Sequence, residues 1–559
     1  MTDLVEARTA NLNDIPHILS IEERVWPVGL RANHDMLRSR MLTFPQGQVV
    51  ATFRDRICGF LSTQICDFDI RNPARSWYQA TDSGHIRRTH NPNGNVLFGV
   101  NLSALPVREA NVVDALLLAA GELIVRFNLE GAALGARLAR YYRFAGSMTA
   151  DEYARAVTGR GRPIDPELSL YCRYGLKLVM VLPEYIDDAE SLNNGVLMFW
   201  RNPLHREAGP VTTFSYIDQV YDPAFREAVP RWILLLPGAG CEWAKKSGCL
   251  MCGFGKSIAE FWEGRHPTSR EIGIIYRLGR RLVQSERPRT LTIYNGGSFL
   301  NDREIPLDVQ TAILDDVATH ESISGITVET RPEFVTSERL SLYMSRLDGK
   351  RLCLGIGLES ASDLIRQRCI NKGFDRVTYE RAVKTARDAG AEVLTYVFLK
   401  PPYLTEKESI VDAINSVRYA FEVGSHSVAI EAAFVQEGTF LHGLFQKGRF
   451  RPPWLWSIAE VLKACAHLGP VLAGGFRDEP PPIAVPANCG ECDRDVLEAF
   501  EEYNRTLDVS LLGRLRCHCQ REWNAALLQE QDHLSADIFT AGAATEIDDA
   551  SERLCEADI

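Results

Sequence analysis

Residues 237–255 read PGAGCEWAKKSGCLMCGFG, and this stretch gives Cys241, Cys249 and Cys252 the spacing C-x7-C-x2-C. It directly follows Trp232 to Leu236, a continuous apolar run that is typical of a buried parallel strand. A [4Fe–4S] cluster takes four thiolate ligands, so three cysteines would leave one iron open to chelate a substrate. The flanking glycines allow the loop to wrap closely around such a cluster. The competing interpretation is a zinc site that lacks one ligand.

Strands, loops and helices alternate from this stretch to about residue 435. Such alternation is typical of α/β folds, and it predicts a partial, TIM-type (β/α) barrel. The expected strands are Leu291–Tyr294, Gly325–Thr330, Leu352–Leu358 and Val393–Leu399, and the expected helices include Asp308–Thr319 and Tyr379–Ala389.

Three motifs follow the expected strands, at the end where barrel enzymes place their active sites. They lie at residues 294–300, which contain a Gly-Gly pair, at residues 328–333 and at residues 355–360. Taken alone, a Gly-Gly pair is equally typical of a plain turn, and a charged pair in the second motif is equally typical of a solvated loop. The candidate site residues in the three motifs are Asn295, Gly296, Gly297, Ser298, Glu329, Arg331 and Glu359.

Together with the cysteine loop, these motifs resemble the radical SAM superfamily over roughly residues 230–480. The seven-residue first spacer is longer than usual, and it resembles the branch of the Elongator catalytic subunit and the radical subunit of archaeosine synthase. The resemblance implies that Cys241, Cys249 and Cys252 hold a catalytic [4Fe–4S] cluster with S-adenosylmethionine (SAM) on its open iron. It also implies SAM contacts from the motif residues, reductive cleavage to a 5′-deoxyadenosyl radical, and an electron donor such as flavodoxin or ferredoxin.

A second cysteine group lies near the C-terminus, where Cys489-x2-Cys492 is followed after 24 residues by Cys517-His518-Cys519. Two close pairs of thiolates suit a closed tetrahedral zinc site, and they also suit a second iron–sulfur cluster. His518 is an alternative ligand. We favour a structural metal because a tail of about 60 residues has little hydrophobic core of its own.

Several short motifs are spread over residues 1–205. They are Val25-Trp26-Pro27, Phe44-Pro45-x-Gly47-Gln48, Trp77-x3-Thr81, Thr89-His90-x3-Gly94 and Trp200-x-Asn202-Pro203. These motifs resemble the GNAT acyltransferase superfamily, in particular the GNAT domains of polyketide loading modules. The resemblance implies a mixed-sheet domain, an acyl-CoA or acyl carrier phosphopantetheine ligand, and catalytic roles for Thr81 and His90. The competing interpretation of His90 is a packed loop histidine.

One stretch departs from the GNAT pattern. GNAT enzymes cradle the CoA pyrophosphate with backbone N–H groups at a glycine-rich helix start, whereas residues 107–113 read VREANVV and contain no glycine. Side chains there would crowd the phosphates. The domain is therefore expected to bind a carrier phosphopantetheine, to bind CoA weakly, or to serve as a docking module.

The bulk composition is that of a globular protein. The 559 residues include 45% hydrophobic and 24% charged residues, and the net charge is −11. This balance argues against a basic coat for nucleic-acid binding, although it leaves room for a local basic groove. Neither a signal peptide nor an apolar run long enough to span a membrane is found, so we expect a cytoplasmic protein without membrane contact.

The α/β chain is expected to have five segments. They are a GNAT-like domain at 1–205, a linker at 206–230, a radical SAM domain at 231–480, a cysteine-rich metal module at 481–530 and an acidic, disordered tail at 531–559.

Two enzymatic functions are compatible with this organisation. The first is a radical SAM enzyme of a biosynthetic pathway that modifies a small metabolite or an acyl thioester, because a GNAT-like domain accompanies the radical domain. The second is a radical SAM enzyme that adds an acyl-derived group to tRNA or remodels a modified base, because the relatives in this branch act on tRNA. A third interpretation, an inactive metal-bound scaffold, is disfavoured because three ligands poorly satisfy a purely structural site.

Overall fold

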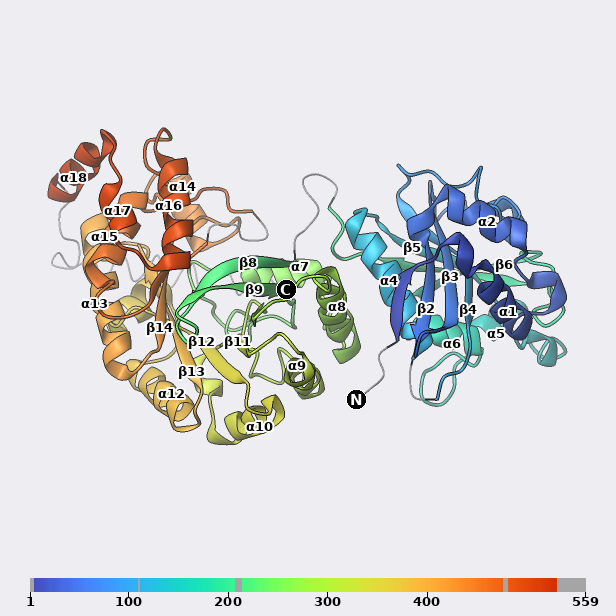
Figure 1. Cartoon of the computed structure of the whole chain (residues 1–559). Coiled ribbons are helices and arrows are strands. Elements are labelled where there is room, and N and C mark those ends of the chain that lie inside the picture. Colours follow the sequence, from blue (N-terminus) through green and yellow to red (C-terminus); the bar gives the residue numbers. More distant parts are fainter. Residues whose placement is uncertain (1–4, 109–110, 207–213, 476–480, 530–559) are drawn as a thin grey trace. The chain divides into compact units, whose positions relative to one another are not determined.

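The chain divides into two compact units, Met1–Thr213 and Phe214–Ile559, and each unit is built around one sheet. The expected acidic tail at 531–559 lies outside the described residues. Within the described part, no helix is both long enough and apolar enough to cross a bilayer. Figure 1 shows the computed structural model, which describes residues 5–108, 111–206, 214–475 and 481–529.

In the described part of the first unit, seven strands form one mixed sheet in the order β1-β2-β3-β4-β5-β7-β6, as expected for a GNAT-like domain. Neighbouring strands are antiparallel except for β4 and β5, which run parallel. The strands are β1 (Glu6–Thr9), β2 (Gln48–Phe53), β3 (Arg56–Cys66), β4 (Val96–Ala104), β5 (Gly131–Arg137), β6 (Lys177–Leu182) and β7 (Gly195–Arg201).

Helices cover both faces of this sheet. The helices are α1 (Ile15–Val25), α2 (His34–Thr43), α3 (Trp77–Ala80), α4 (Val112–Arg126), α5 (Ala150–Arg155) and α6 (Pro166–Cys172). Successive side chains of a strand point to opposite faces, and the two hydrophobic cores follow this alternation. Val50 and Phe60 pack with residues of α1 and α2, whereas Val49 and Leu61 pack with residues of α4.

In the described part of the second unit, eight strands form a sheet in the order β15-β14-β13-β12-β11-β10-β9-β8. Strands β9 to β15 are parallel, and β8 pairs antiparallel with β9. This arrangement confirms the expected partial barrel. The strands are β8 (Ser215–Asp222), β9 (Glu227–Leu235), β10 (Thr290–Tyr294), β11 (Gly325–Thr330), β12 (Arg351–Glu359), β13 (Glu392–Leu399), β14 (Ser427–Ala432) and β15 (Val471–Ala473).

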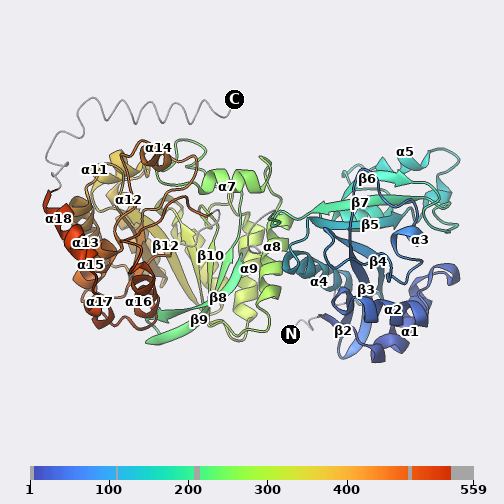
Figure 2. The same cartoon turned by 90° about the horizontal axis from the view of Figure 1, so that it is seen from above.

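Helices cover the outer face of the parallel sheet, as Figure 2 shows. The helices in the described part of this unit are α7 (Phe254–Phe261), α8 (Ser269–Leu282), α9 (Leu307–Thr319), α10 (Ser337–Leu347), α11 (Asp363–Ile365), α12 (Arg376–Asp388), α13 (Glu406–Val423), α14 (Phe440–Gln446), α15 (Leu455–Cys465), α16 (Asp493–Thr506), α17 (Ser510–Arg514) and α18 (Cys519–Gln529). The Trp232 ring of β9 packs against Tyr276 of α8, with ring centroids 5.8 Å apart. Because side chains alternate along a strand, the neighbouring Arg231 faces the interior of the barrel.

The interval expected to be a linker, residues 206–230, differs from this expectation. It contains β8 and the first half of β9, and the Trp232 Nε1–H donates to Ser215 Oγ at 2.9 Å across the pair. The expected strand began at Trp232 because only that half is a continuous apolar run. The first half of β9 and all of β8 mix polar with apolar residues and contain no such run, since an edge hairpin is buried less completely than a central strand.

The C-terminal helices pack onto the barrel and share its core. Val496 and Phe500 of α16 belong to the same buried cluster as Leu462 of α15 and Val471 of β15. The Asn504 side chain of α16 pairs with the backbone of the edge strand: the Ala473 N–H donates to Oδ1 at 2.9 Å, and Nδ2–H donates to the Ala473 carbonyl at 2.8 Å. Helix α16 therefore covers the open edge of the barrel.

Candidate active site and metal centre

The first cysteine group lies in the loop between β9 and α7, at the C-terminal end of the parallel sheet. The loop is fastened to the segment that follows α11. Leu250 N–H donates to the Ile370 carbonyl at 2.9 Å, and Trp243 Nε1–H donates to the Asn371 carbonyl at 2.8 Å. The Asn371 amide in turn donates to the Gly248 carbonyl at 2.8 Å. These contacts explain the close fit of the loop against residues 370–373.

The thiols of this group lie close enough for their charges to interact. Burial raises the pKa of the Cys249 thiol against the opposing charges of Lys372 and Arg331. Cys252 is exposed to solvent, and the surrounding chain, followed by the neighbouring Cys249 thiol, raises the pKa of its thiol, with Cys241 acting in the same direction. Iron would displace these protons because a metal binds the thiolate. The loop thus offers three sulfur ligands beside the charged side chains of Lys372 and Arg331. The role of the three cysteines as cluster ligands stays a prediction.

The predicted glycine-rich motif after β10 packs directly against the cysteine loop. Gly296 has a left-handed backbone (φ +61°), and a Cβ there would lie 2.6 Å from Ile258 Cδ1. A Cβ on Gly297 would lie 2.1 Å from Glu304 Oε2 and 3.3 Å from Cys241 Cα. A side chain at Gly296 would collide with α7, and a side chain at Gly297 would collide with Glu304 and approach the cysteine loop.

Asn295 is the second residue of this motif and is 2% exposed. Neither its amide nitrogen nor its amide oxygen has a hydrogen-bond partner within the described chain. A buried carboxamide without partners is unfavourable, and native proteins rarely keep one. A polar ligand beside the cysteine loop would supply the missing partners, so the residues present fit SAM.

Glu304 is the main residue of this site that the sequence patterns did not indicate. Its buried carboxylate accepts from the backbone N–H of Glu242 at 3.0 Å, from the backbone N–H of Ser298, and from Asn301 Nδ2–H at 2.9 Å. Burial raises its pKa against these three hydrogen bonds. One carboxylate therefore connects the cysteine loop to the glycine-rich loop. Ser298, Asn301 and Glu304 follow one another at intervals of three residues, and this spacing is only a weak local signal for their contact.

Arg331 and Glu359 lie beside the cysteine loop, as expected for strand-end residues. Arg331 Nε–H donates to Glu333 at 2.6 Å, its guanidinium donates to the Lys372 carbonyl at 2.9 Å, and it lies 5.3 Å from the centre of the Trp243 ring. Glu359 has φ +65° and accepts from Lys372 Nζ at 2.5 Å. Both predicted SAM contacts thus have protein partners, and Lys372 is a further charged residue of the site.

Below this loop cluster, the interior of the barrel carries two phenols and several charges. The Tyr396 hydroxyl is buried without a hydrogen-bond partner in the described part of the chain, and a Cβ on Gly355 would lie 2.8 Å from it. Burial raises the pKa of Tyr294 and of Tyr396, and Glu329 adds to both shifts. Both phenols therefore keep their protons at neutral pH and can donate a hydrogen bond to a substrate.

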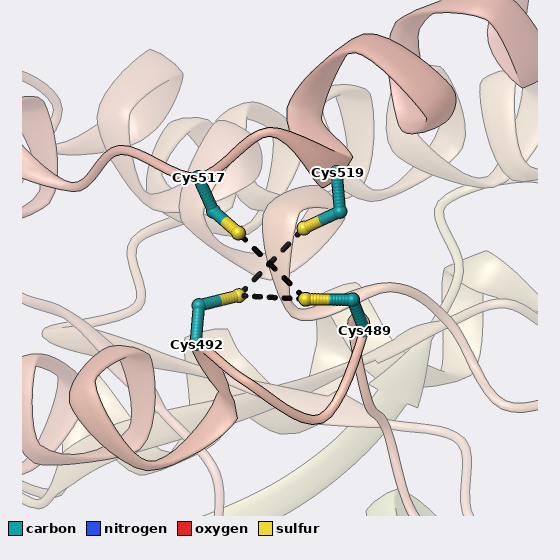
Figure 3. Close-up of side chains that lie close together, drawn as sticks. All are labelled: Cys489, Cys492, Cys517 and Cys519. Carbon is teal, nitrogen blue, oxygen red and sulfur yellow. Dashed lines mark hydrogen bonds between the residues drawn. The ribbon is translucent and has the colours of Figure 1, made fainter.

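The second cysteine group forms a compact site, shown in Figure 3. The sulfurs of Cys489, Cys492, Cys517 and Cys519 all lie within 4.8 Å of one another. The Cys489–Cys492, Cys489–Cys517 and Cys492–Cys519 separations are 3.9, 3.7 and 3.7 Å. A regular tetrahedron with metal–sulfur bonds of about 2.3 Å separates its sulfurs by about 3.8 Å. The spacing therefore fits one tetrahedral ion, whereas a multi-iron cluster holds its thiolates farther apart.

Burial and hydrogen-bond donors act in opposite directions on these sulfurs, and burial raises the pKa of the Cys492 and Cys519 thiols. Trp456 Nε1–H donates to Cys519 Sγ at 3.2 Å, and Asn488 Nδ2–H donates to Cys492 Sγ at 3.5 Å. The backbone N–H of Cys492 lowers the pKa of the Cys489 thiol to about 7. The donors and the lowered pKa of Cys489 favour binding of a cation, because metals bind the deprotonated form, and a bound cation would offset the effect of burial on Cys492 and Cys519.

In the first unit, the structure places Thr81 and His90 in the segment between α3 and β4. The Thr81 hydroxyl is buried; it donates to the Trp77 carbonyl at 2.7 Å and accepts from Gly84 N–H at 3.0 Å. His90 Nδ1 accepts from Ile65 N–H at 3.2 Å, so the neutral ring carries its proton on Nε2, and burial lowers the pKa of the ring. Thr81 thus has a local structural role, and the catalytic roles of both residues stay predictions.

The helix start that GNAT enzymes use for pyrophosphate is occupied by the chain itself. The Asn111 side chain accepts from Asp114 N–H at 3.2 Å and caps α4, while residues 109–110 lie outside the described part. An N-terminal amide that already has a side-chain partner is less available to a phosphate. This geometry agrees with the missing glycines of the sequence.

Comparisons with known proteins find similarity to both units. The chain is 33% identical over 304 residues to archaeosine synthase subunit beta of Methanosarcina acetivorans, which covers 53% of this chain and 84% of that protein. It is 36% identical over 200 residues to the uncharacterized N-acetyltransferase YkwB of Bacillus subtilis, which covers 35% of this chain and 88% of that protein. The loading GNATL domain of CurA from Lyngbya majuscula is a similar solved structure, with 22% identity and a TM-score of 0.31, covering 35% of this chain and 97% of that domain. No model of a known protein family matches the chain.

Proposed function

Since the chain belongs to the family of archaeosine synthase subunit beta, a family of radical SAM enzymes, we propose that it uses radical chemistry to modify a nucleoside of tRNA. The radical SAM and GNAT-like resemblances of the sequence are both confirmed by the relatives. The observation that supports the choice of substrate is the 33% identity to archaeosine synthase subunit beta over 84% of that protein.

When bound, a [4Fe–4S] cluster supplies the electron that splits SAM into methionine and a 5′-deoxyadenosyl radical. Cys241, Cys249 and Cys252 would hold this cluster. Asn295 would offer a donor and an acceptor to SAM, because its buried amide has neither partner within the described chain. Glu304 keeps the cysteine loop and the glycine-rich loop in register through its hydrogen bonds to both. A small reductant protein such as flavodoxin or ferredoxin would deliver the electron.

The barrel interior would hold the reacting part of the substrate. Tyr396 and Tyr294 stay protonated and offer hydroxyl donors, and Glu329 offers a carboxylate on the same inner face. Donors and an acceptor on one wall suit the polar edge of a base. The net negative charge of the chain requires that tRNA be bound through local basic surface rather than through the whole molecule.

An acyl thioester is a second candidate substrate, and the GNAT-like domain favours it. The 36% identity to an N-acetyltransferase supports an acyl-handling role for this domain. The capped start of α4 is a poor pyrophosphate site, so a carrier-bound phosphopantetheine suits the domain better than CoA. In the combined reading, the GNAT-like domain delivers an acyl group that the radical domain uses on tRNA.

We expect tRNA to stimulate SAM cleavage. The reconstituted protein would be incubated with SAM and dithionite, alone and with tRNA, acyl-CoA or an acyl carrier thioester. 5′-Deoxyadenosine is then quantified by chromatography and tRNA nucleosides by mass spectrometry. Stimulation by tRNA with a mass change in one nucleoside supports the proposal. Stimulation by a thioester alone, with unchanged tRNA, supports the second candidate and contradicts the first.

We expect Tyr396→Phe to weaken substrate binding while SAM cleavage without substrate is retained. The variant removes one hydroxyl donor from the barrel wall, and a hydrogen bond contributes about 1 kcal/mol, or about fivefold in affinity. The measurement is the KM for tRNA in the coupled 5′-deoxyadenosine assay. Tyr419→Phe is the matched control, because that hydroxyl donates to Glu380 between two outer helices. Equal KM values for both variants would place the substrate away from Tyr396.

A further inference from the structure

Gln436 lies in the segment after β14 and contacts the peptide next to a predicted cluster ligand. It is 2% exposed, and its Oε1 accepts from the backbone N–H of Gly253 at 2.9 Å. Gly253 directly follows Cys252. A Cβ on Gly253 would lie 2.7 Å from Oε1 and 3.1 Å from the Gln436 Cβ. The side chain therefore lies flat against the cysteine loop, and only a glycine allows this approach.

The other end of the same carboxamide has no partner. Gln436 Nε2 is buried and makes no hydrogen bond within the described chain. The orientation of the amide is settled by Gly253, because its N–H requires the oxygen and not the nitrogen. A buried amide N–H without an acceptor is unfavourable. The acceptor that completes this site therefore belongs to a group bound beside Cys252.

The backbone beside Gln436 is held by the segment that leads to the second cysteine group. Val435 N–H donates to the Ala484 carbonyl at 2.8 Å, and Ile483 N–H donates to the Val435 carbonyl at 2.7 Å. This short antiparallel bridge holds the backbone next to Gln436. The carboxamide is thus supported on one side by residues 483–484 and on the other by the cysteine loop, as a positioning residue requires.

We propose that Gln436 is a positioning residue for the radical cluster, with a role for each end of its carboxamide. The oxygen holds the Gly253 peptide and thereby orients Cys252. The nitrogen donates a hydrogen bond to an inorganic sulfide of the cluster. Hydrogen bonds to the sulfurs stabilise the more negative, reduced cluster and raise its reduction potential. This proposal rests on the radical SAM cluster and does not depend on the substrate.

Two variants separate the two ends of the side chain. Gln436→Glu keeps an oxygen for Gly253 N–H but replaces the N–H donor by a carboxylate oxygen. Gln436→Leu removes both groups. Glu437→Gln is the matched control, since Glu437 is the exposed neighbour on the same loop. Each protein would be reconstituted with iron and sulfide, its fold checked by circular dichroism, and its reduced cluster titrated by electron paramagnetic resonance in the absence of SAM.

We expect a more negative midpoint potential in both Gln436 variants and an unchanged potential in the control. Gln436→Glu should keep the full iron content, whereas Gln436→Leu should lose part of it because Gly253 N–H loses its acceptor. Unchanged potentials in both variants would overturn the proposal. A weaker SAM affinity with an unchanged potential would also overturn it, because the N–H would then serve SAM. A failure of tRNA to stimulate the enzyme would leave these potentials unaffected, so the two proposals fail separately.

Discussion

Replacing Cys249 by alanine is expected to abolish formation of 5′-deoxyadenosine, down to the uncatalysed background. Two remaining thiolates cannot hold a [4Fe–4S] cluster that keeps one iron open, because such a cluster needs three protein ligands. The protein itself should stay folded, since Cys249 lies in a loop and is only partly buried. The effect is therefore on chemistry, with little effect on stability.

Three measurements on the reconstituted variant check this expectation: iron and sulfide per chain, the spectrum of the reduced cluster with and without SAM, and 5′-deoxyadenosine. Cys172→Ser is the matched control, because Cys172 is an exposed cysteine of the first unit. The control should keep about four irons per chain. A Cys249→Ala protein that retained this iron content and cleaved SAM would refute the assignment of the cysteine loop.

The parts of the site that could be predicted from the sequence are those with a local signal. The three cysteines lie within twelve residues directly after a buried strand, and the motif residues follow strands at regular intervals. In a parallel barrel, all these strand ends meet at one face, so the topology alone brings the motifs together. The sequence pattern was therefore sufficient to place these residues at one face, and their roles as ligands stay predictions.

The residues that support the site have no such local signal. Glu304 contacts the backbone of Glu242, 62 residues away, and Gln436 contacts that of Gly253, 183 residues away. Each lies in an irregular loop and accepts a hydrogen bond from a distant backbone N–H. Because nearly every residue type has a backbone N–H, the residue type of the partner gives no sign of this contact. A single sequence therefore predicts which residues bind a cofactor better than which residues hold those ligands in place.

The choice between zinc and an iron–sulfur cluster at the C-terminus likewise required distances. The spacing of the four cysteines along the chain permits both, whereas sulfur separations of 3.7–3.9 Å fit a single ion. The linker expectation at 206–230 was wrong for a related reason, since an edge hairpin carries a weak hydrophobic pattern. In both cases the local sequence was compatible with two structures. The distances between the four sulfurs and the pairing of β8 with β9 decided between them.

Replacing Cys519 by serine is expected to release the C-terminal ion and to lower the free energy of unfolding by about 4 kcal/mol. This value corresponds to an ion that binds only the folded chain at about a thousand times its Kd. Cys519 is buried and begins α18, whereas Cys492 precedes α16, so the ion joins the two helices. Without the ion, α16 would still bury Val496 and Phe500 against the barrel. The decrease in the free energy of unfolding is therefore only part of the free energy of metal binding.

Metal analysis should find one zinc per chain in the parent protein and none in Cys519→Ser, with urea denaturation giving the change in stability. Hydrogen exchange at Ala473 reports on α16 directly, because that N–H donates to Asn504 at 2.9 Å.

His518→Ala is the matched control. His518 and Glu491 form an alternative metal-binding group with Cys489, but His518 is exposed, and four thiolates already complete a tetrahedron. The control should therefore keep the ion and the slow exchange at Ala473. Loss of zinc in His518→Ala with retention in Cys519→Ser would move the site to the histidine group, and additional iron in place of zinc would replace the single ion by a cluster.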